Sequence, residues 1–135
     1  MDNHLIVKKT TLSQDDAVRN LRAAITRRGI AEFAVFDHAR AAADVGLKLS
    51  GETVVVFGNP AVGTALMQAD ADVGVELPLR VLVRSAPTGA QLVYADPRRL
   101  AERFELGAEL GTLEKLAAVL ESITDEIAQS DPANP

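Results

Sequence analysis

The alternation of hydrophobic and polar positions divides the chain into strands and amphipathic helices. Short runs rich in apolar and β-branched residues predict five strands, at residues 4–10, 32–37, 53–57, 79–84 and 91–94. Apolar residues at three-and-four spacing predict one helix that begins after Ser13 and ends at Gly29, and a longer one over 113–128. Shorter helices are expected at residues 38–45, 61–68 and 97–104.

The order of these elements predicts the fold class. The last two strands flank a Pro87-Thr88-Gly89 turn and read as a hairpin, which favours antiparallel pairing over a doubly wound parallel sheet. We therefore expect an α+β fold, with a mixed, mainly antiparallel sheet of about five strands and helices packed on one face. The expected order is β-α-β4-α with short inserted helices, and the acidic segment 69–78 is expected to be a loop.

Chain length and tail composition set the domain organisation. The 135 residues suffice for one core, and residues 1–128 are predicted to form a single α+β domain. The final stretch, QSDPANP over 129–135, has no hydrophobic cluster and is predicted to be disordered.

Composition and charge remove several classes of function. The chain has no cysteine, which excludes thiol catalysis and thiolate metal sites and suits a cytoplasmic protein. Its 14 basic and 19 acidic residues give a net charge of −5, and the basic residues are dispersed, so we expect no nucleic-acid partner. No apolar run is long enough for a signal sequence or a membrane span, so no membrane partner is expected either.

The segment TVVVFGNPAVGTALM, residues 53–67, suggests a site at a strand-to-helix turn. It resembles a phosphate-binding loop, but the required lysine is missing and Pro60 removes a backbone donor, so a nucleoside triphosphate site is rejected. Asn59 followed by Pro60 is typical of a helix start, whose free N–H groups could hold an anion unless Asn59 already satisfies them. Gly63 inside the helix indicates that another backbone or a ligand approaches closely.

A second candidate is the pair Asp37-His38, since a carboxylate beside an imidazole can serve a general base or a metal. Adjacent strand residues point to opposite faces, and no second histidine lies at ligand spacing, so no metal site is predicted. The alternative is that Asp37 caps the following helix and His38 lies at the boundary.

Tyr94, the only tyrosine, ends a strand and either makes a structural hydrogen bond or joins a pocket. A few polar groups amid apolar surface are typical of small-molecule sites. The candidate ligand-binding residues, in a pocket beside the turn, are His38, Asn59, Gly63, Thr64, Met67, Gln68 and Tyr94. No cofactor is predicted. Two alternatives stay open: an enzyme, of hydrolase type or another, with Asp37 or His38 as general base, and a purely structural dimeric module.

Several motifs together resemble one protein family. They comprise Phe36-Asp37-His38, Phe57-Gly58-Asn59-Pro60 with Gly63-Thr64 and Leu66-Met67-Gln68, Leu77-Pro78-Leu79, and Tyr94 with Asp96-Pro97 and Arg103. Over residues 5 to 105 the chain resembles the bacterial and archaeal domain of unknown function 302. The resemblance implies a TATA-binding-protein-like β-α-β4-α fold and a homodimer. The chain departs from that pattern at Arg84, where an aromatic residue is common, and at Phe104, where a histidine is common.

Overall fold

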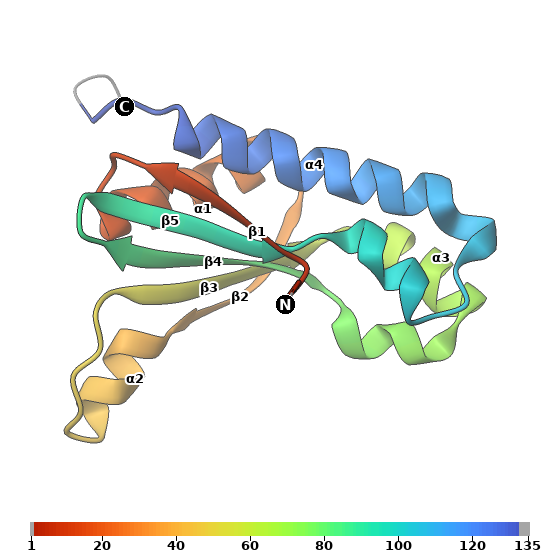
Figure 1. Ribbon diagram of the computed structural model, residues 1–135, viewed down its shortest axis with the longest axis horizontal. Helices are drawn as coiled ribbons and strands as arrows, with labels where there is room; N and C mark the ends of the chain where they lie inside the picture. Colours follow the sequence, from red (N-terminus) through yellow and green to blue (C-terminus); the bar gives the residue numbers. More distant parts are fainter. Residues whose placement is uncertain (1, 133–135) are drawn as a thin grey trace.

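A five-stranded sheet forms the centre of the computed structural model, which describes residues 2–132 (Figure 1). Its strands are β1 (Leu5–Thr10), β2 (Ala31–Asp37), β3 (Glu52–Gly58), β4 (Leu79–Ala86) and β5 (Gly89–Ala95). They lie in the order β1-β5-β4-β3-β2, and every neighbouring pair is antiparallel. The α+β prediction is confirmed. The sheet is purely antiparallel and not mixed, because β1 and β2, which run in the same direction, occupy opposite edges and do not pair.

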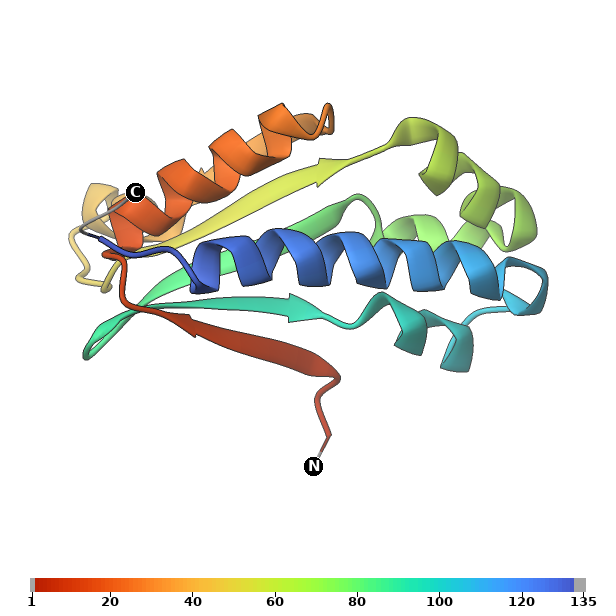
Figure 2. The same ribbon diagram turned by 90° about the horizontal axis from the view of Figure 1, so that it is seen from above.

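Two helices cover one face of this sheet. Helix α1 (Gln14–Arg27) and helix α4 (Leu110–Ala128) lie across the strands on the same side (Figure 2). The Ser13 side chain accepts a hydrogen bond from the Asp16 backbone N–H and begins α1 at the predicted position. The main core lies between these helices and the sheet, built from residues such as Leu21, Ile25, Val55, Leu92 and Ile123.

The remaining helices are short and lie at the two ends of the sheet. They are α2 (His38–Asp44), α3 (Pro60–Ala69) and the 3-10 helices η1 (Ala71–Glu76), η2 (Pro97–Glu102) and η3 (Gly107–Glu109). Helix α3 and the 3-10 helices pack on the first half of α4 around a second apolar cluster, Leu66, Val73, Leu106, Leu113 and Leu116. This second cluster supports the strand-to-helix turn that the sequence singled out.

Several predicted elements and bounds differ from the structure. The expected loop at 69–78 contains η1, because the Asp70 carboxylate caps it by accepting the Asp72 backbone N–H. The helix expected at 97–104 is a 3-10 helix, and α4 begins at Leu110 instead of 113 because η3 leads directly into it. Gln129 and Ser130 hydrogen-bond back to α4, whereas residues 133–135 of the predicted tail lie outside the described residues.

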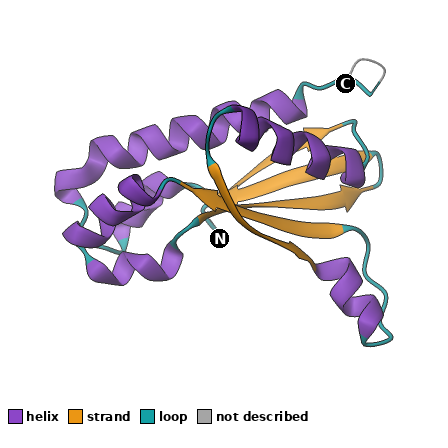
Figure 3. Cartoon of the chain, turned by 180° about the vertical axis from the view of Figure 1, so that it is seen from behind, coloured by secondary structure: helices purple, strands orange, loops and turns teal. Residues whose placement is uncertain are grey.

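The opposite face of the sheet carries no helix within residues 2–132, as Figures 1 and 3 show from two sides. A cross-strand row of apolar residues runs over it, and we call this row the open face: Val7, Val93, Leu82, Val54 and Phe36. Residues 38–50, comprising α2 and the following segment, project beside it, and we call them the arm. No residue of α2 is buried.

Candidate functional site

The strand-to-helix turn is organised by Asn59. Strand β3 ends at Gly58, and the Asn59 side-chain oxygen accepts the Ala61 backbone N–H at 2.9 Å, which begins α3. Pro60 takes the first helical position, where its fixed φ suits the helix and its missing N–H is not needed. The Asn59 side chain therefore caps its own helix, which is the alternative to anion binding that the sequence analysis gave.

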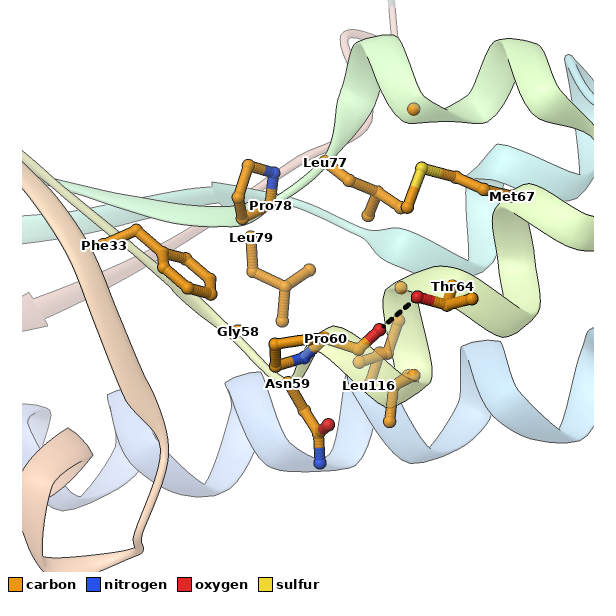
Figure 4. Close-up of a pocket in the computed structure, with 13 residues that line it drawn as sticks. Phe33, Gly58, Asn59, Pro60, Thr64, Met67, Leu77, Pro78, Leu79 and Leu116 are labelled. Carbon is orange, nitrogen blue, oxygen red and sulfur yellow. Dashed lines mark hydrogen bonds between the residues drawn. The ribbon is translucent and has the colours of Figure 1, made fainter.

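A cavity of about 230 Å³ lies beside this turn, and we call it the Gly63 cavity (Figure 4). One wall is the face of α3 that carries Pro60, Gly63, Thr64 and Met67. The segment Leu77–Leu79, which links η1 to β4, forms the facing wall. Phe33 of β2 and Leu116 of α4 complete the lining from either side.

Part of the cavity lining lies on the same side of the sheet as the open face. Phe57 is fully buried against the core, so the next residue, Gly58, presents the opposite face of β3. A Cβ atom built on Gly58 would lie 3.5 Å from the Phe33 ring and 3.7 Å from Pro78. Phe33 and Pro78 therefore stand over the side of the sheet that α1 and α4 leave uncovered.

The lining is apolar and uncharged. In the part of the chain that the structure describes, Asn59 and Thr64 contribute the only polar side chains of the lining. The Thr64 hydroxyl donates to the Pro60 carbonyl oxygen at 2.7 Å, which leaves its lone pairs as acceptors. The Asn59 amide points away from Phe33 and Pro78, toward α4 (Figure 4). No lysine or arginine lines the cavity among residues 2–132, so its chemistry does not support an anion.

Gly63 leaves space that the protein itself does not fill. A Cβ atom at this position would meet Leu77 at 3.8 Å and Met67 at 3.9 Å, both ordinary van der Waals contacts. The glycine is thus not required by a close approach of another backbone, which was one of the two explanations for it. A glycine inside a helix costs about 1 kcal/mol relative to alanine, so its presence here widens the cavity at a cost in stability.

The structure brings four of the seven predicted ligand-binding residues together. Asn59, Gly63, Thr64 and Met67 all line the Gly63 cavity. Gln68 follows Met67 on α3 but is exposed and lies outside the lining, because successive helical residues point about 100° apart.

His38 lies at the far end of the sheet from the cavity. Ala31 pairs with Gly58 and Asp37 with Thr53, so the length of β2, roughly 20 Å, separates His38 from the turn. The Asp37 carboxylate accepts the Arg40 backbone N–H at 2.9 Å and caps α2. Neither Asp37 nor His38 contributes to the Gly63 cavity, so a base formed by this pair would not act on a ligand bound there.

Tyr94 lies on the covered face of the sheet. It is buried between β5 and α4, opposite Ile6 in the strand register, and therefore points away from the cavity. Burial raises the pKa of the Tyr94 phenol, and a hydrogen bond with the Thr124 side chain partly offsets that shift. These contacts are those of a structural tyrosine.

The cavity also uses residues that the pocket prediction did not include. Phe33, Leu77, Leu79 and Leu116 are apolar, and their local patterns are those of ordinary core positions. The available signal was the Leu77-Pro78-Leu79 motif, which occurs together with the Gly-Asn-Pro turn. The structure explains why these two motifs occur together, because they form facing walls of the Gly63 cavity.

Two further features of the described residues bear on function. No group of three or more His, Cys, Asp or Glu side chains is placed to hold a metal ion within residues 2–132. Across the same residues, no helix combines the length and apolar character needed to cross a membrane.

Comparison with known proteins identifies relatives by sequence and by structure. The family described as "Domain of unknown function DUF302" matches residues 6–126. A crystal structure of an uncharacterized conserved DUF302 protein from Bacillus stearothermophilus superposes with a TM-score of 0.83, covering 95% of this chain and 100% of that one at 13% identity. At that identity the likeness establishes the fold alone.

Curated relatives are longer proteins. A fluoride-specific ion channel, FluC 1 of Brucella suis biovar 1, is 32% identical over 108 residues, which is 79% of this chain and 42% of that protein. FluC 1 of Brucella abortus biovar 1 matches at the same identity over 40% of its length. The chain thus spans about two fifths of these relatives, and the activity in their names belongs to the longer proteins.

Proposed function

This chain belongs to the DUF302 family, and we propose that it binds a small, uncharged and largely apolar ligand in the Gly63 cavity. One observation carries the proposal: the cavity has apolar walls, and its only polar side chains among residues 2–132 are Asn59 and Thr64. Small-molecule sites combine such walls with a few polar groups that fix orientation.

The absence of charge from the lining sets the ligand's chemistry. Transferring a charged group into an apolar cavity without a partner carries a large desolvation penalty, whereas a neutral apolar body carries none. The Thr64 hydroxyl, already donating to Pro60, offers an acceptor to a ligand N–H or O–H. A neutral ligand with one donor fits this arrangement better than an anion.

Cavity volume sets the ligand's size. An apolar cavity of about 150 Å³ accommodates a benzene ring. At about 230 Å³, the Gly63 cavity has room for one substituted ring, a fused pair of rings, or a short acyl chain. Burying roughly 150 Å² of apolar surface contributes about 4 kcal/mol before the costs of association. We therefore expect dissociation constants of about 1 mM or weaker.

A thermal-shift comparison of neutral and charged ligands tests this proposal. Indole and 4-methylphenol are the neutral probes, and benzoate, benzylammonium and inorganic phosphate are the charged ones. A neutral probe at ten times its dissociation constant stabilises the folded state by about 1.4 kcal/mol. Stabilisation by the neutral probes alone is the expected result. No shift with any neutral probe, or equal shifts with benzoate or phosphate, would contradict the proposal.

A further inference from the structure

A second hollow, of about 370 Å³, lies on the other face of α3, and we call it the Lys115 groove. Its walls are α3 and the first half of α4, which run alongside each other beyond the end of β3 (Figure 2). Ala61 and Ala65 face this groove, whereas Gly63 and Thr64 face the Gly63 cavity. Phe57, which is buried in the main core, forms its floor, so the groove lies on the covered side of the sheet.

The polar side chains of the groove lining, within residues 2–132, are Asn59, Thr112 and Lys115. The Asn59 side-chain oxygen accepts the Ala61 backbone N–H, while the amide nitrogen points toward α4 (Figure 4). The Thr112 hydroxyl donates to the Glu109 carboxylate at 2.6 Å, so it has no proton to offer a ligand. Two donors therefore remain for a ligand in the groove, the Asn59 amide on one wall and the Lys115 ammonium on the other.

Lys115 carries a positive charge that the described part of the chain does not neutralise. It takes part in none of the salt bridges within residues 2–132. The helix positions one turn away, where an acidic partner would stand, are occupied by Gly111, Thr112, Ala118 and Val119. No carboxylate lines the groove in the described part of the chain, and Glu109 is engaged with Thr112 outside the lining. A cation beside apolar walls and without an acidic partner is complementary to an anionic group on an apolar ligand.

We propose that the Lys115 groove is a second binding site, for a carboxylate that carries an unbranched aliphatic chain. The carboxylate lies between Lys115 and the Asn59 amide, which offer N–H donors from the two walls. The chain lies against the apolar part of the lining, which includes Ile30, Ala65 and Val119. A lysine packs its methylene groups on apolar surface and keeps its ammonium at the edge of the water. The carboxylate therefore stays at the rim of the groove and avoids the cost of full burial.

The walls of the groove favour a hydrocarbon chain over a peptide. A peptide brings an N–H and a carbonyl at each residue, and these groups need hydrogen-bond partners when they are buried. Beyond Asn59, Thr112 and Lys115, the groove lining within residues 2–132 has no polar side chain to supply them. From Thr112 to Val119 the groove follows α4 for about 10 Å, which suits an extended chain of about eight carbons. Octanoate is therefore the probe that fits the site.

The groove and the Gly63 cavity are two sites with different chemistry. Lys115 lines the groove alone, and no charged side chain lines the cavity among residues 2–132. The turn at Gly58 and Asn59 contributes to both linings and stands between them. The groove proposal does not depend on ligand binding in the cavity, because octanoate is titrated alone and the two sites are followed by different amides. Failure of one proposal is thus distinguishable from failure of the other.

An amide NMR titration of the full chain with octanoate tests this proposal. We expect saturable shifts of the Ala61, Ala65 and Lys115 amides, which line the groove, and smaller changes at Gly63 and Gly74, which line the cavity. Octan-1-ol has the same chain length without the charge, and its dissociation constant at the groove amides is expected to be about fivefold higher. Benzoate has the charge without the chain, so it covers little of the groove and is expected to bind at least tenfold more weakly than octanoate.

Lys115→Met tests the charge while it keeps the length of the side chain. Lys115 is exposed, so the variant is expected to fold as the wild-type protein does, and circular dichroism checks this. We expect octanoate to bind about fivefold more weakly and to lose its advantage over octan-1-ol. Lys48→Met is the matched control, because Lys48 is an exposed lysine of the arm that takes part in no salt bridge within residues 2–132. It removes the same charge far from the groove and should leave octanoate binding unchanged.

Ala61→Leu tests the position of the chain. Ala61 is exposed and lines the groove but not the Gly63 cavity, so a larger side chain there narrows the groove without entering the core. Binding of octanoate and of octan-1-ol at the groove amides should weaken together, at least fivefold. The proposal would be overturned by the absence of saturable shifts with octanoate, by shifts at Gly63 and Gly74 in place of the groove amides, or by equal effects of Lys115→Met and Lys48→Met.

Discussion

At the scale of single residues, the turn is explained by local chemistry. Asn59 accepts a backbone N–H and Pro60 occupies the first position of α3, so two adjacent side chains determine where the helix begins. Gly63 is different, because neither backbone conformation nor packing requires it. A residue that weakens its helix without a structural reason is explained by the space it leaves in the cavity wall.

Gly63→Ala is therefore expected to separate stability from binding. The added methyl group makes ordinary contacts with Leu77 and Met67, so the free energy of unfolding should rise by up to about 1 kcal/mol. The same methyl group occupies cavity volume, so binding of the neutral probes should weaken severalfold. Urea denaturation measures the stability, and isothermal calorimetry measures the binding.

Gly111→Ala is the control for this change. Gly111 also lies in a helix, α4, and a Cβ atom there would meet nothing within 4 Å. This substitution is expected to stabilise the protein to a similar degree and to leave probe binding unchanged. If Gly63→Ala bound the probes as tightly as the wild-type protein, the glycine would have no role in the site.

At the scale of elements, ion pairs join the two helices that cover the sheet. The Glu126 carboxylate of α4 accepts hydrogen bonds from Arg27, at the end of α1, and from Arg28. The hydrogen bond with Arg27, followed by that with Arg28, lowers the pKa of Glu126 from its ordinary value of 4.5. A carboxylate with a lowered pKa in the folded state stabilises the protein above its unfolded pKa, and this stabilisation is lost as the pH falls through the folded value.

Glu126→Gln should accordingly destabilise the protein at neutral pH and not in acid. The three side chains are between 31% and 63% exposed, so the loss at pH 7 should be below about 1 kcal/mol. The difference from the wild-type protein should shrink as the pH falls below about 4.5 and Glu126 becomes protonated. Thermal denaturation at several pH values measures this.

Glu114→Gln controls for the general loss of a negative charge. Glu114 is an exposed residue of α4, and none of the ion pairs within residues 2–132 includes it; its charge acts on the exposed Arg98 only at longer range. Its substitution should change stability little at any pH. A Glu126→Gln deficit that stayed constant from neutral pH into acid would show that the ion pairs do not account for the effect.

At the scale of the whole molecule, local sequence patterns predicted the elements but not which of their ends meet. Period-two and three-and-four patterns located the strands and the long helices, and Asn59-Pro60 located the start of α3. The expected convergence of His38 with Asn59 failed because both follow the carboxyl ends of neighbouring antiparallel strands, and these ends lie at opposite ends of the strand pair. Tyr94 points to the covered face. Antiparallel pairing decides the first placement and the choice of covered face decides the second, and local periodicity encodes neither.

The apolar walls of the cavity were hidden from sequence reasoning for a similar reason. Phe33 and Leu116 are 83 positions apart by their residue numbers, and each looks like a core residue in its own segment. Only the packing of α3 between β2, the 77–79 segment and α4 brings them around one space. Sequence reasoning identifies candidate sites mainly by their polar residues, whereas this cavity is lined mainly by apolar residues.

The most direct test of the account is an amide NMR titration of the uniformly 15N-labelled protein with indole. Three of the nine glycines line the cavity, Gly58, Gly63 and Gly74, while Gly29, Gly46, Gly107 and Gly111 lie outside the lining and serve as internal references. The account predicts saturable shifts of the three cavity glycine amides with little change at the references, and no such shifts with benzoate. Saturable shifts confined to residues outside the cavity, or no saturable shift with indole, would contradict it.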